Sequence, residues 1–157
     1  MMIQVRTLPF WRVAHPLSEG EVPCGPYRYL VAARQALAVH GEAAEWGHGR
    51  RIVAMLEALA DTHSEDVDHP SPWREGLATT RRPVLPGEYS GFPGYGALVH
   101  WFEGWLPQLD EAGFLLYRYD VPVGRMRTSR GGRQSLAVLE SLEPAGVSQL
   151  PPETARA

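Results

Sequence analysis

The alternation of apolar and polar positions in the first third of the chain predicts one strand followed by two helices. Residues 10–15, FWRVAH, are aromatic and β-branched and are bounded by prolines, which is typical of a strand. Residues 29–40 and 48–61 each carry apolar residues at the three- and four-residue spacing of an amphipathic helix. The short linker between them, 41–47, predicts an antiparallel helical pair.

The pattern changes twice in the rest of the chain. After the second helix no long periodic run survives, although residues 77–85 could hold a short edge strand. Residues 95–106 return to helical spacing, and Gly113 ends a second short helical piece. Two or three β segments follow, the first over 114–121 and the last over 133–141, entered through a turn at RGG.

These elements predict an α+β fold, a small mixed or antiparallel sheet with strands at both ends of the chain and helices packed on it. At 157 residues the chain is long enough for one domain with its own core. We expect a single domain over residues 1–141. Residues 142–157 are rich in proline and alanine and are expected to form a disordered tail.

Composition narrows the possible partners. The formal net charge of −3 gives no global attraction to nucleic acid, so nucleic acid is not an expected partner. No segment approaches the roughly 20 apolar residues that span a bilayer, and a signal peptide is not recognisable, so a cytoplasmic protein without membrane association is expected. The single cysteine excludes an internal disulfide, and the absence of lysine excludes a Walker phosphate loop.

Two groups of residues invite a chemical interpretation that their spacing does not support. Residues 61–69 are rich in His, Asp and Glu, but they lack metal-site spacing, so a solvated acidic loop and no metal site are expected. Cys24 lies nine positions after His15, but a thiol enzyme also needs a group that orients the base. The Gly-x-Ser-x-Gly motif of a serine hydrolase is absent.

A cluster of arginines in the predicted hairpin is a stronger signal. Its members are Arg118, Arg125, Arg127, Arg130 and Arg133. In a hairpin Arg125 and Arg127 would share one face, where guanidinium groups could bind phosphate oxygens. The alternative, a solvent-exposed β face kept soluble by arginine, fits the pattern equally well.

Arg12 differs because it stands in the middle of an apolar strand. If it is buried, its charge needs a partner. One interpretation places it on an edge strand, pointing into water. The other places it in a cleft, where it would receive an anionic group from a ligand or a neighbouring carboxylate.

Four segments together resemble a family of small uncharacterised proteins of phage and actinobacterial genomes. They cover most of residues 10–140: WRVAHPLSEGEVPCGPYR, HPSPWREG, SGFPGYGALVHWFEGWLPQLDEAGFLLYRYDVP and GGRQSLAVLE. The shared positions are Arg12, Gly25 to Tyr27, His69 to Pro72, Gly91-Phe92, Trp101-Phe102, Tyr119 to Pro122 and Gln134. Relative to that pattern, residues 29–60 look like a helical-pair insertion. The resemblance implies no established function.

The order of these elements is also similar to that of ADP-ribosyltransferases, at the level of the fold. That likeness implies an arginine on the first strand, a serine or tyrosine in the middle and a glutamate on a late strand. Arg12 and the pair Tyr89-Ser90 fit the first two places. Gln134 falls at the third and cannot act as a carboxylate, which leaves catalysis and the catalytic residues unassigned, and Glu140 is six residues further on.

Three hypotheses follow. The protein binds an NAD- or ADP-ribose-like nucleotide in a cleft and acts on it, or it only sequesters such a nucleotide, or it is a protein-interaction module whose partner contacts Trp46 and Trp73. Under the ligand hypotheses a small nucleotide is the partner and no other cofactor is assigned. The expected ligand-binding residues are Arg12, Tyr27, His69, Trp73, Ser90 and Gln134.

Overall fold

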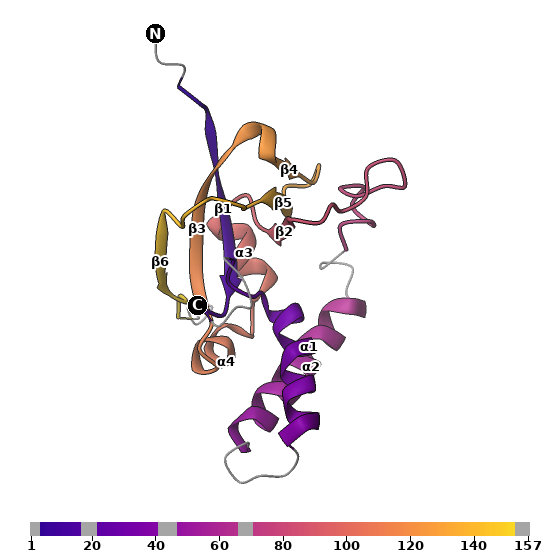
Figure 1. Cartoon of the computed structure of the whole chain (residues 1–157), viewed down its shortest axis with the longest axis vertical. Helices are drawn as coiled ribbons and strands as arrows, with labels where there is room; N and C mark the ends of the chain where they lie inside the picture. The colour runs from indigo at the N-terminus through magenta and orange to yellow at the C-terminus, as the bar shows by residue number, and fades with distance from the viewer. Residues whose placement is uncertain (1–3, 17–21, 41–46, 66–70, 153–157) are drawn as a thin grey trace, which may run out of the picture.

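The computed structural model describes residues 4–16, 22–40, 47–65 and 71–152 (Figure 1). Its elements in chain order are β1 (Thr7–Ala14), α1 (Pro26–His40), α2 (Gly47–Glu65), β2 (Glu88–Gly91), α3 (Tyr95–Trp101), α4 (Leu106–Glu111), β3 (Leu115–Pro122), the 3-10 helix η2 (Val123–Arg125), β4 (Met126–Thr128), β5 (Ser135–Val138) and β6 (Gly146–Gln149). None of the helices in these ranges combines the length and the apolarity that crossing a bilayer requires.

The strands form two antiparallel sheets of three strands, in the orders β1-β3-β6 and β2-β5-β4. Strands lie near both ends of the chain and the helices between them, so the predicted α+β class is confirmed. The hairpin expected around RGG is also confirmed, because β4 pairs with β5 across the turn. Figure 1 shows α1 and α2 side by side, extending away from the two sheets.

The two sheets are joined where β1 passes β2. Trp11 and Phe92 exchange both backbone hydrogen bonds, at 2.9 and 2.8 Å. Gly91 makes this approach possible, since a Cβ at its position would lie 2.4 Å from the Phe10 ring and 2.7 Å from the Trp11 carbonyl oxygen. A side chain there would push the sheets apart.

The β1-β3-β6 sheet separates two apolar clusters because successive side chains of a strand point to opposite faces. On one face, Val13 and Leu116 pack with residues of the four helices. On the other, Phe10, Ala14 and Tyr119 pack against Ala137 and Leu139 of the second sheet region. Arg12 belongs by alternation to this second face, between Phe10 and Ala14.

The predicted pair of helices is confirmed, with longer helices than the pattern indicated. The first begins at Pro26, because proline suits the first helical position, where its missing N–H is not needed. The second continues to Glu65, so the expected acidic loop over residues 61–69 is wrong for its first part: His63 is helical and buried. Its ring packs on Trp101 and Phe102, which extends the apolar stripe of Leu56 and Leu59 by one turn.

The helix expected over residues 95–106 is divided into α3 and α4. Gly104 between them has a φ of +86°, in the left-handed region that ends helices. Pro107 then occupies the first turn of α4. The short helical piece before Gly113 is therefore present, but it begins earlier than the periodicity suggested.

The edge strand expected within residues 77–85 is not present, and these residues form turns and irregular structure. The reason is that Arg127 takes the carbonyl oxygens that a neighbouring strand would use. Its guanidinium donates to the carbonyls of Leu77 at 2.8 Å, Arg82 at 3.1 Å and Pro83 at 2.8 Å. The strand of this region, β2, starts only at Glu88.

The expectation of a disordered tail over residues 142–157 is wrong for residues 146–149. These residues form β6, which pairs with β3 between Leu115 and Arg118. The side chain of Leu150 then packs into the helix-facing cluster and is 6% exposed. The prolines that suggested disorder flank the strand rather than interrupt it; residues 153–157 lie outside the described residues.

Candidate functional site

A pocket of about 720 Å³ lies where the two sheets meet the ends of the helices. Its wall includes Arg12 and Val13 of β1, residues 88–91 of β2, the start of α1, the end of α2 and the end of α3. The volume is in the range of small-molecule sites. Four of the six residues expected to bind a ligand line it: Arg12, Tyr27, Ser90 and Gln134.

Arg12 is buried, with 6% of its surface exposed, although β1 is an edge strand. The interpretation that points Arg12 into water is therefore wrong, because the residue is buried and lines the pocket; that it receives an anionic group stays a prediction. Its Nε donates to the Ser90 carbonyl at 3.0 Å and its Nη1 to the Pro23 carbonyl at 2.9 Å. The guanidinium carbon lies 5.2 Å from the centre of the Tyr89 ring. These contacts orient the cation from one side.

No carboxylate of the described residues pairs with Arg12. Burial lowers the pKa of Arg12 from its ordinary value, and the nearby charge of Arg28 lowers it further. Arginine nevertheless stays protonated in proteins. The pocket wall therefore contains a buried positive charge to which the described residues offer carbonyl dipoles and an aromatic ring.

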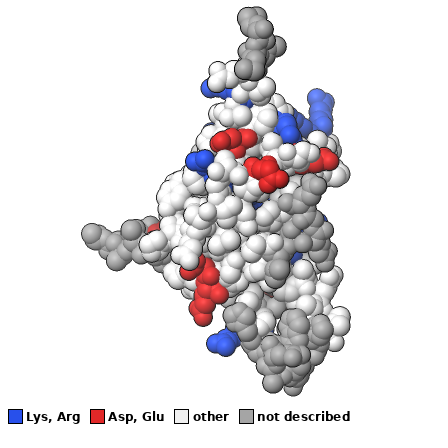
Figure 2. Space-filling model, turned by 60° about the vertical axis from the view of Figure 1, so that its left-hand side comes forward, with Lys and Arg blue, Asp and Glu red and all other residues white. Residues whose placement is uncertain are grey.

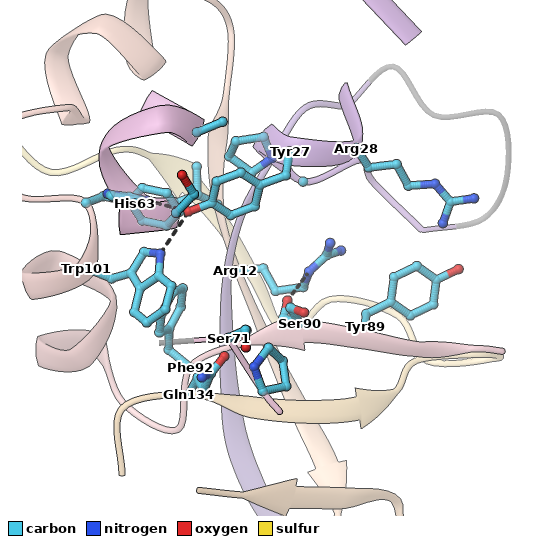
Figure 3. Close-up of a pocket in the computed structure, with 18 of the residues that line it drawn as sticks. Arg12, Tyr27, Arg28, His63, Ser71, Tyr89, Ser90, Phe92, Trp101 and Gln134 are labelled. Atoms are coloured by element: carbon cyan, nitrogen blue, oxygen red, sulfur yellow. Dashed lines mark hydrogen bonds between the residues drawn. The ribbon is translucent and has the colours of Figure 1, made fainter. Parts of the chain in front are cut away.

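The opposite side of the pocket is held by a hydrogen-bonded cluster of three rings (Figure 3). The Trp101 indole donates to the Tyr27 hydroxyl at 3.0 Å, and that hydroxyl is also hydrogen-bonded to His63 Nδ1. Because indole can only donate, all three groups are satisfied when Tyr27 donates its proton to an unprotonated Nδ1. Burial raises the pKa of Tyr27 to about 12, against the opposing effect of the Trp101 hydrogen bond.

Ser90 of β2 and Gln134, which directly precedes β5, reach the pocket from neighbouring parts of the second sheet. The Gln134 side chain is buried, and its Nε2 donates to Glu75 Oε1 at 2.8 Å. Ser90 presents an exposed side chain, while its carbonyl accepts from Arg12. The Arg12 side chain of β1 and the Gln134 side chain beside β5 therefore line the same pocket, as expected.

The remaining two expected residues do not join this group. His69 lies outside the described residues. Trp73 is 52% exposed and is absent from the described lining of the pocket, whereas its neighbours Pro72 and Arg74 line it. The described lining instead contains the aromatic rings of Tyr27, Tyr89, Phe92, Trp101 and Phe102.

The cationic patch expected on the hairpin is not formed as predicted. Arg125 lies in η2 rather than on a strand and donates to the Glu140 carbonyl. Arg127 is buried in an ion pair with Glu88, with Nη2 to Oε1 at 2.6 Å and Nε to Oε2 at 2.8 Å. The described lining of the pocket includes no arginine of this cluster. Figure 2 shows acidic and basic side chains interspersed over the upper part of one face.

The ion pair also bears on the chemistry of the pocket. Glu88 is the carboxylate residue in the described lining, and the Arg127 hydrogen bonds hold its pKa below the ordinary value. The negative charge of Glu88 is therefore neutralised by Arg127 within the protein. The described lining contains three arginines, Arg12, Arg28 and Arg74. It contains one carboxylate, that of Glu88, which is already paired with Arg127.

Neither a thiol-enzyme site at His15 and Cys24 nor a metal site receives support from the described residues. His15 and Cys24 meet through their backbones, at 2.7 and 3.0 Å, while the His15 ring stacks on Tyr29 at 4.6 Å. Burial lowers the pKa of His15. In the described ranges no three His, Cys, Asp or Glu side chains are grouped to hold a metal ion.

Sequence reasoning missed Arg28, His63 and Trp101 as pocket residues. Signals for the first two were present. Gly25 followed by Pro26 is the pattern of a helix start, which would have placed Arg28 in a first turn. His63 continues the helical spacing of Leu56 and Leu59. The indole of Trp101 could not be assigned a hydroxyl partner without the tertiary structure.

Comparison with protein families gives a match over residues 2–146 to the family described as Bacteriophage T4 Y00F protein. Comparison with curated proteins and with solved structures gave no match. The expected resemblance to a phage protein family is confirmed by this match. The likeness to ADP-ribosyltransferases receives no support from it and stays a prediction.

Proposed function

The chain belongs to the Bacteriophage T4 Y00F protein family, and we propose that this phage-family protein binds a nucleotide-like ligand of the NAD or ADP-ribose class in its pocket. Such a ligand joins a phosphate to an aromatic ring. The proposal concerns binding and sequestration of the nucleotide rather than its turnover.

Arg12 is the observation that carries this proposal. A buried guanidinium is costly unless it is compensated, and removal from water costs a charge several kcal/mol, of the order of 5, even after relaxation. The described residues offer Arg12 two carbonyls and a ring face, but no carboxylate. A phosphate bound in the pocket would supply the missing charge, and its oxygens match the guanidinium fork.

The aromatic residues of the pocket supply the second half of the ligand site. Tyr27, Phe92 and Trp101 form a largely apolar wall, and the cluster with His63 holds two of these rings in place. A ligand ring that stacks there would gain about 1–3 kcal/mol per stacked base, as in other nucleotide sites. Ser90 and Gln134 would offer hydrogen bonds between the two ends.

The carboxylates favour binding over cleavage of the nicotinamide–ribose bond. A developing oxocarbenium ion is stabilised by negative charge placed beside it. Glu88 is paired with Arg127, and Gln134 is an amide. We therefore expect no release of nicotinamide from NAD incubated with the protein, as measured by chromatography; release would instead favour an ADP-ribosyltransferase-like enzyme.

Isothermal titration calorimetry with NAD, ADP-ribose and cyclic nucleotides tests the proposal. We expect at least one to bind, and Arg12→Ala to weaken that affinity about tenfold or more, because a charge-assisted hydrogen bond contributes about 1.5–3 kcal/mol. Arg6→Ala, an exposed arginine just before the same strand, is the matched control and should bind normally. Circular dichroism shows whether both variants stay folded. Normal binding by a folded Arg12→Ala protein would contradict the proposal.

The exposed Trp73 favours a second candidate function, a protein-interaction module. Tryptophan is enriched among the residues that dominate protein interfaces, and 52% of the Trp73 surface is exposed. A nucleotide panel that gives neither heat nor thermal stabilisation would favour this function. The partner would then be sought by comparing the wild-type protein with Trp73→Ala.

A further inference from the structure

We infer that the anionic group of the ligand lies at the N-terminus of α1, between Arg12 and Arg28, and that this seat selects a dianion over a monoanion. The inference rests on the proposed function and deepens it. It assigns Arg28 the role of a specificity-determining residue, which the sequence pattern did not indicate.

The first turn of α1 has the features of an anion site. The Gly25 carbonyl accepts the first helical hydrogen bond, from the Tyr29 N–H at 2.9 Å, so Gly25 begins the helix. Pro26 has no N–H, which leaves those of Tyr27 and Arg28 without intrahelical acceptors. Gly25, Pro26, Tyr27 and Arg28 all line the pocket. A helix N-terminus carries roughly half a positive charge and attracts anions.

The buried guanidinium of Arg12 is the second, independent observation at this place. A Cβ on Gly25 would lie 3.2 Å from Arg12 Nη2, so the guanidinium lies against the residue that begins α1. Two of its nitrogens are directed to carbonyls by the bonds to Ser90 and Pro23. The Nη2 edge is thereby turned toward the helix start. A glycine at position 25 leaves space for that edge.

Arg28 adds a further positive charge to the same side of the pocket. Figure 3 shows the guanidinium groups of Arg12 and Arg28 and the Tyr89 ring on the side away from His63 and Trp101. Both residues line the same pocket. Among the described residues, the first turn of α1 has no acidic side chain that would offset them.

The charge at this seat determines what it accepts. Two guanidinium groups and a helix N-terminus leave a positive charge of roughly 2.5 that the described residues do not neutralise. A phosphomonoester carries close to two negative charges at neutral pH, and a pyrophosphate linkage also carries two. A cyclic phosphodiester carries one. The seat should therefore prefer the first two.

Three adenine nucleotides separate these possibilities by calorimetry, because they share one ring. AMP presents a phosphomonoester, ADP-ribose a pyrophosphate and cyclic AMP a monoanionic diester. We expect the wild-type protein to bind AMP or ADP-ribose about tenfold or more tightly than cyclic AMP. If AMP is the better ligand, its advantage over cyclic AMP should shrink between pH 7.5 and 5.5, because the second phosphate pKa is about 6. An advantage of ADP-ribose should not change with pH in this range.

Arg28→Ala should reduce the preference for the dianion to about threefold or less, because the loss of one positive charge weakens the attraction of a dianion more than that of a monoanion. Arg34→Ala is the matched control, an exposed arginine two turns along the same helix, and should keep the wild-type preference. Equal affinities of the wild-type protein for all three nucleotides, or an unchanged preference in Arg28→Ala, would overturn the inference while the proposed function stands. Binding of no nucleotide would overturn both.

Discussion

The Tyr27 hydroxyl shows how one polar atom can hold three elements of this protein together. It comes from α1, accepts from Trp101 at the end of α3 and is bonded to His63 near the end of α2. About 40% of the Tyr27 surface is exposed, and the residue lines the pocket. The hydroxyl lies inside, which is why burial raises its pKa to about 12. The helical pair is thereby fixed against the rest of the fold.

Tyr27→Phe tests this role at the scale of a single atom. The substitution keeps the ring but leaves the buried Trp101 N–H without its acceptor, so we expect a loss of about 1–2 kcal/mol in the free energy of unfolding. Tyr95→Phe is the control, because Tyr95 is 44% exposed and packs by its ring edge on Trp11. It should change stability by about 0.5 kcal/mol or less. Urea unfolding followed by tryptophan fluorescence measures both, and equal effects would argue against the hydroxyl.

At the scale of the elements, Arg127 of β4 binds residues 77–88 through side-chain hydrogen bonds, where a paired strand would use backbone hydrogen bonds. Its five donated hydrogen bonds end on Glu88 and on three carbonyls of that segment. The pair with Glu88 is nearly buried, with 10% and 6% of the two side chains exposed. Because Glu88 opens β2, this ion pair also positions Ser90 and Gly91 in the pocket.

Glu88→Gln should therefore destabilise the protein in a pH-dependent way. The hydrogen bonds from Arg127 hold the folded pKa of Glu88 below its ordinary value. A carboxylate with a depressed pKa contributes stability above its unfolded pKa and loses it as pH falls through the folded pKa. We expect a difference from wild type of roughly 2–3 kcal/mol at pH 7 that shrinks below about pH 4.5.

Thermal unfolding from pH 3 to 7 measures this difference. Glu57→Gln is the matched control, because Glu57 pairs with Arg34 on the surface with 44% and 52% of the side chains exposed. That exchange should cost about 0.5 kcal/mol or less. A Glu88→Gln difference that stays constant down to pH 3 would refute the assignment of this pair as a source of stability.

For the whole molecule, the two ends of the chain meet on one sheet, since β1 and β6 flank β3 on either side. The pocket lies where β1 passes β2 of the second sheet. The start of α1 and the ends of α2 and α3 lie at the same place. The described lining of the pocket therefore comes from segments between residues 12 and 134, whereas β6 pairs with β3 outside this range.

Leu150→Ala tests whether the C-terminal segment belongs to the fold. Leu150 is 6% exposed in the helix-facing cluster, so its truncation should cost about 2–5 kcal/mol. Val147→Ala in the same segment should cost about 0.5 kcal/mol or less, because Val147 is 52% exposed. Denaturant unfolding of both variants makes the comparison. If Leu150→Ala leaves the free energy of unfolding unchanged, the result would favour the disordered tail that the composition suggested.

Residue types and spacing account for much of this structure but not for its site. The helical pair and the strands β1, β3 and β5 follow from local periodicity. The break at Gly104 was missed because the left-handed backbone of a glycine is not visible in the side-chain pattern. The end of α2 at Glu65 was misjudged because His63, which continues the helical spacing, was assigned to a polar loop. Strand β6 was missed because its exposed residues pair through backbone groups, which the side-chain pattern does not record.

The sequence by itself determined the α+β class, the order of most elements and the helical pair, because these follow from local spacing. Arg12 was singled out as a charge placed in an apolar strand, and Tyr27, Ser90 and Gln134 were singled out by resemblance; their role in binding a ligand stays a prediction. Only the tertiary structure decided that Arg12 is buried with no carboxylate partner among the described residues, that Arg127 pairs with Glu88 and that Arg28 lines the same pocket as Arg12. Whether an arginine is paired depends on residues up to 78 positions away, such as Ser90 for Arg12, and local pattern carries no record of those distances.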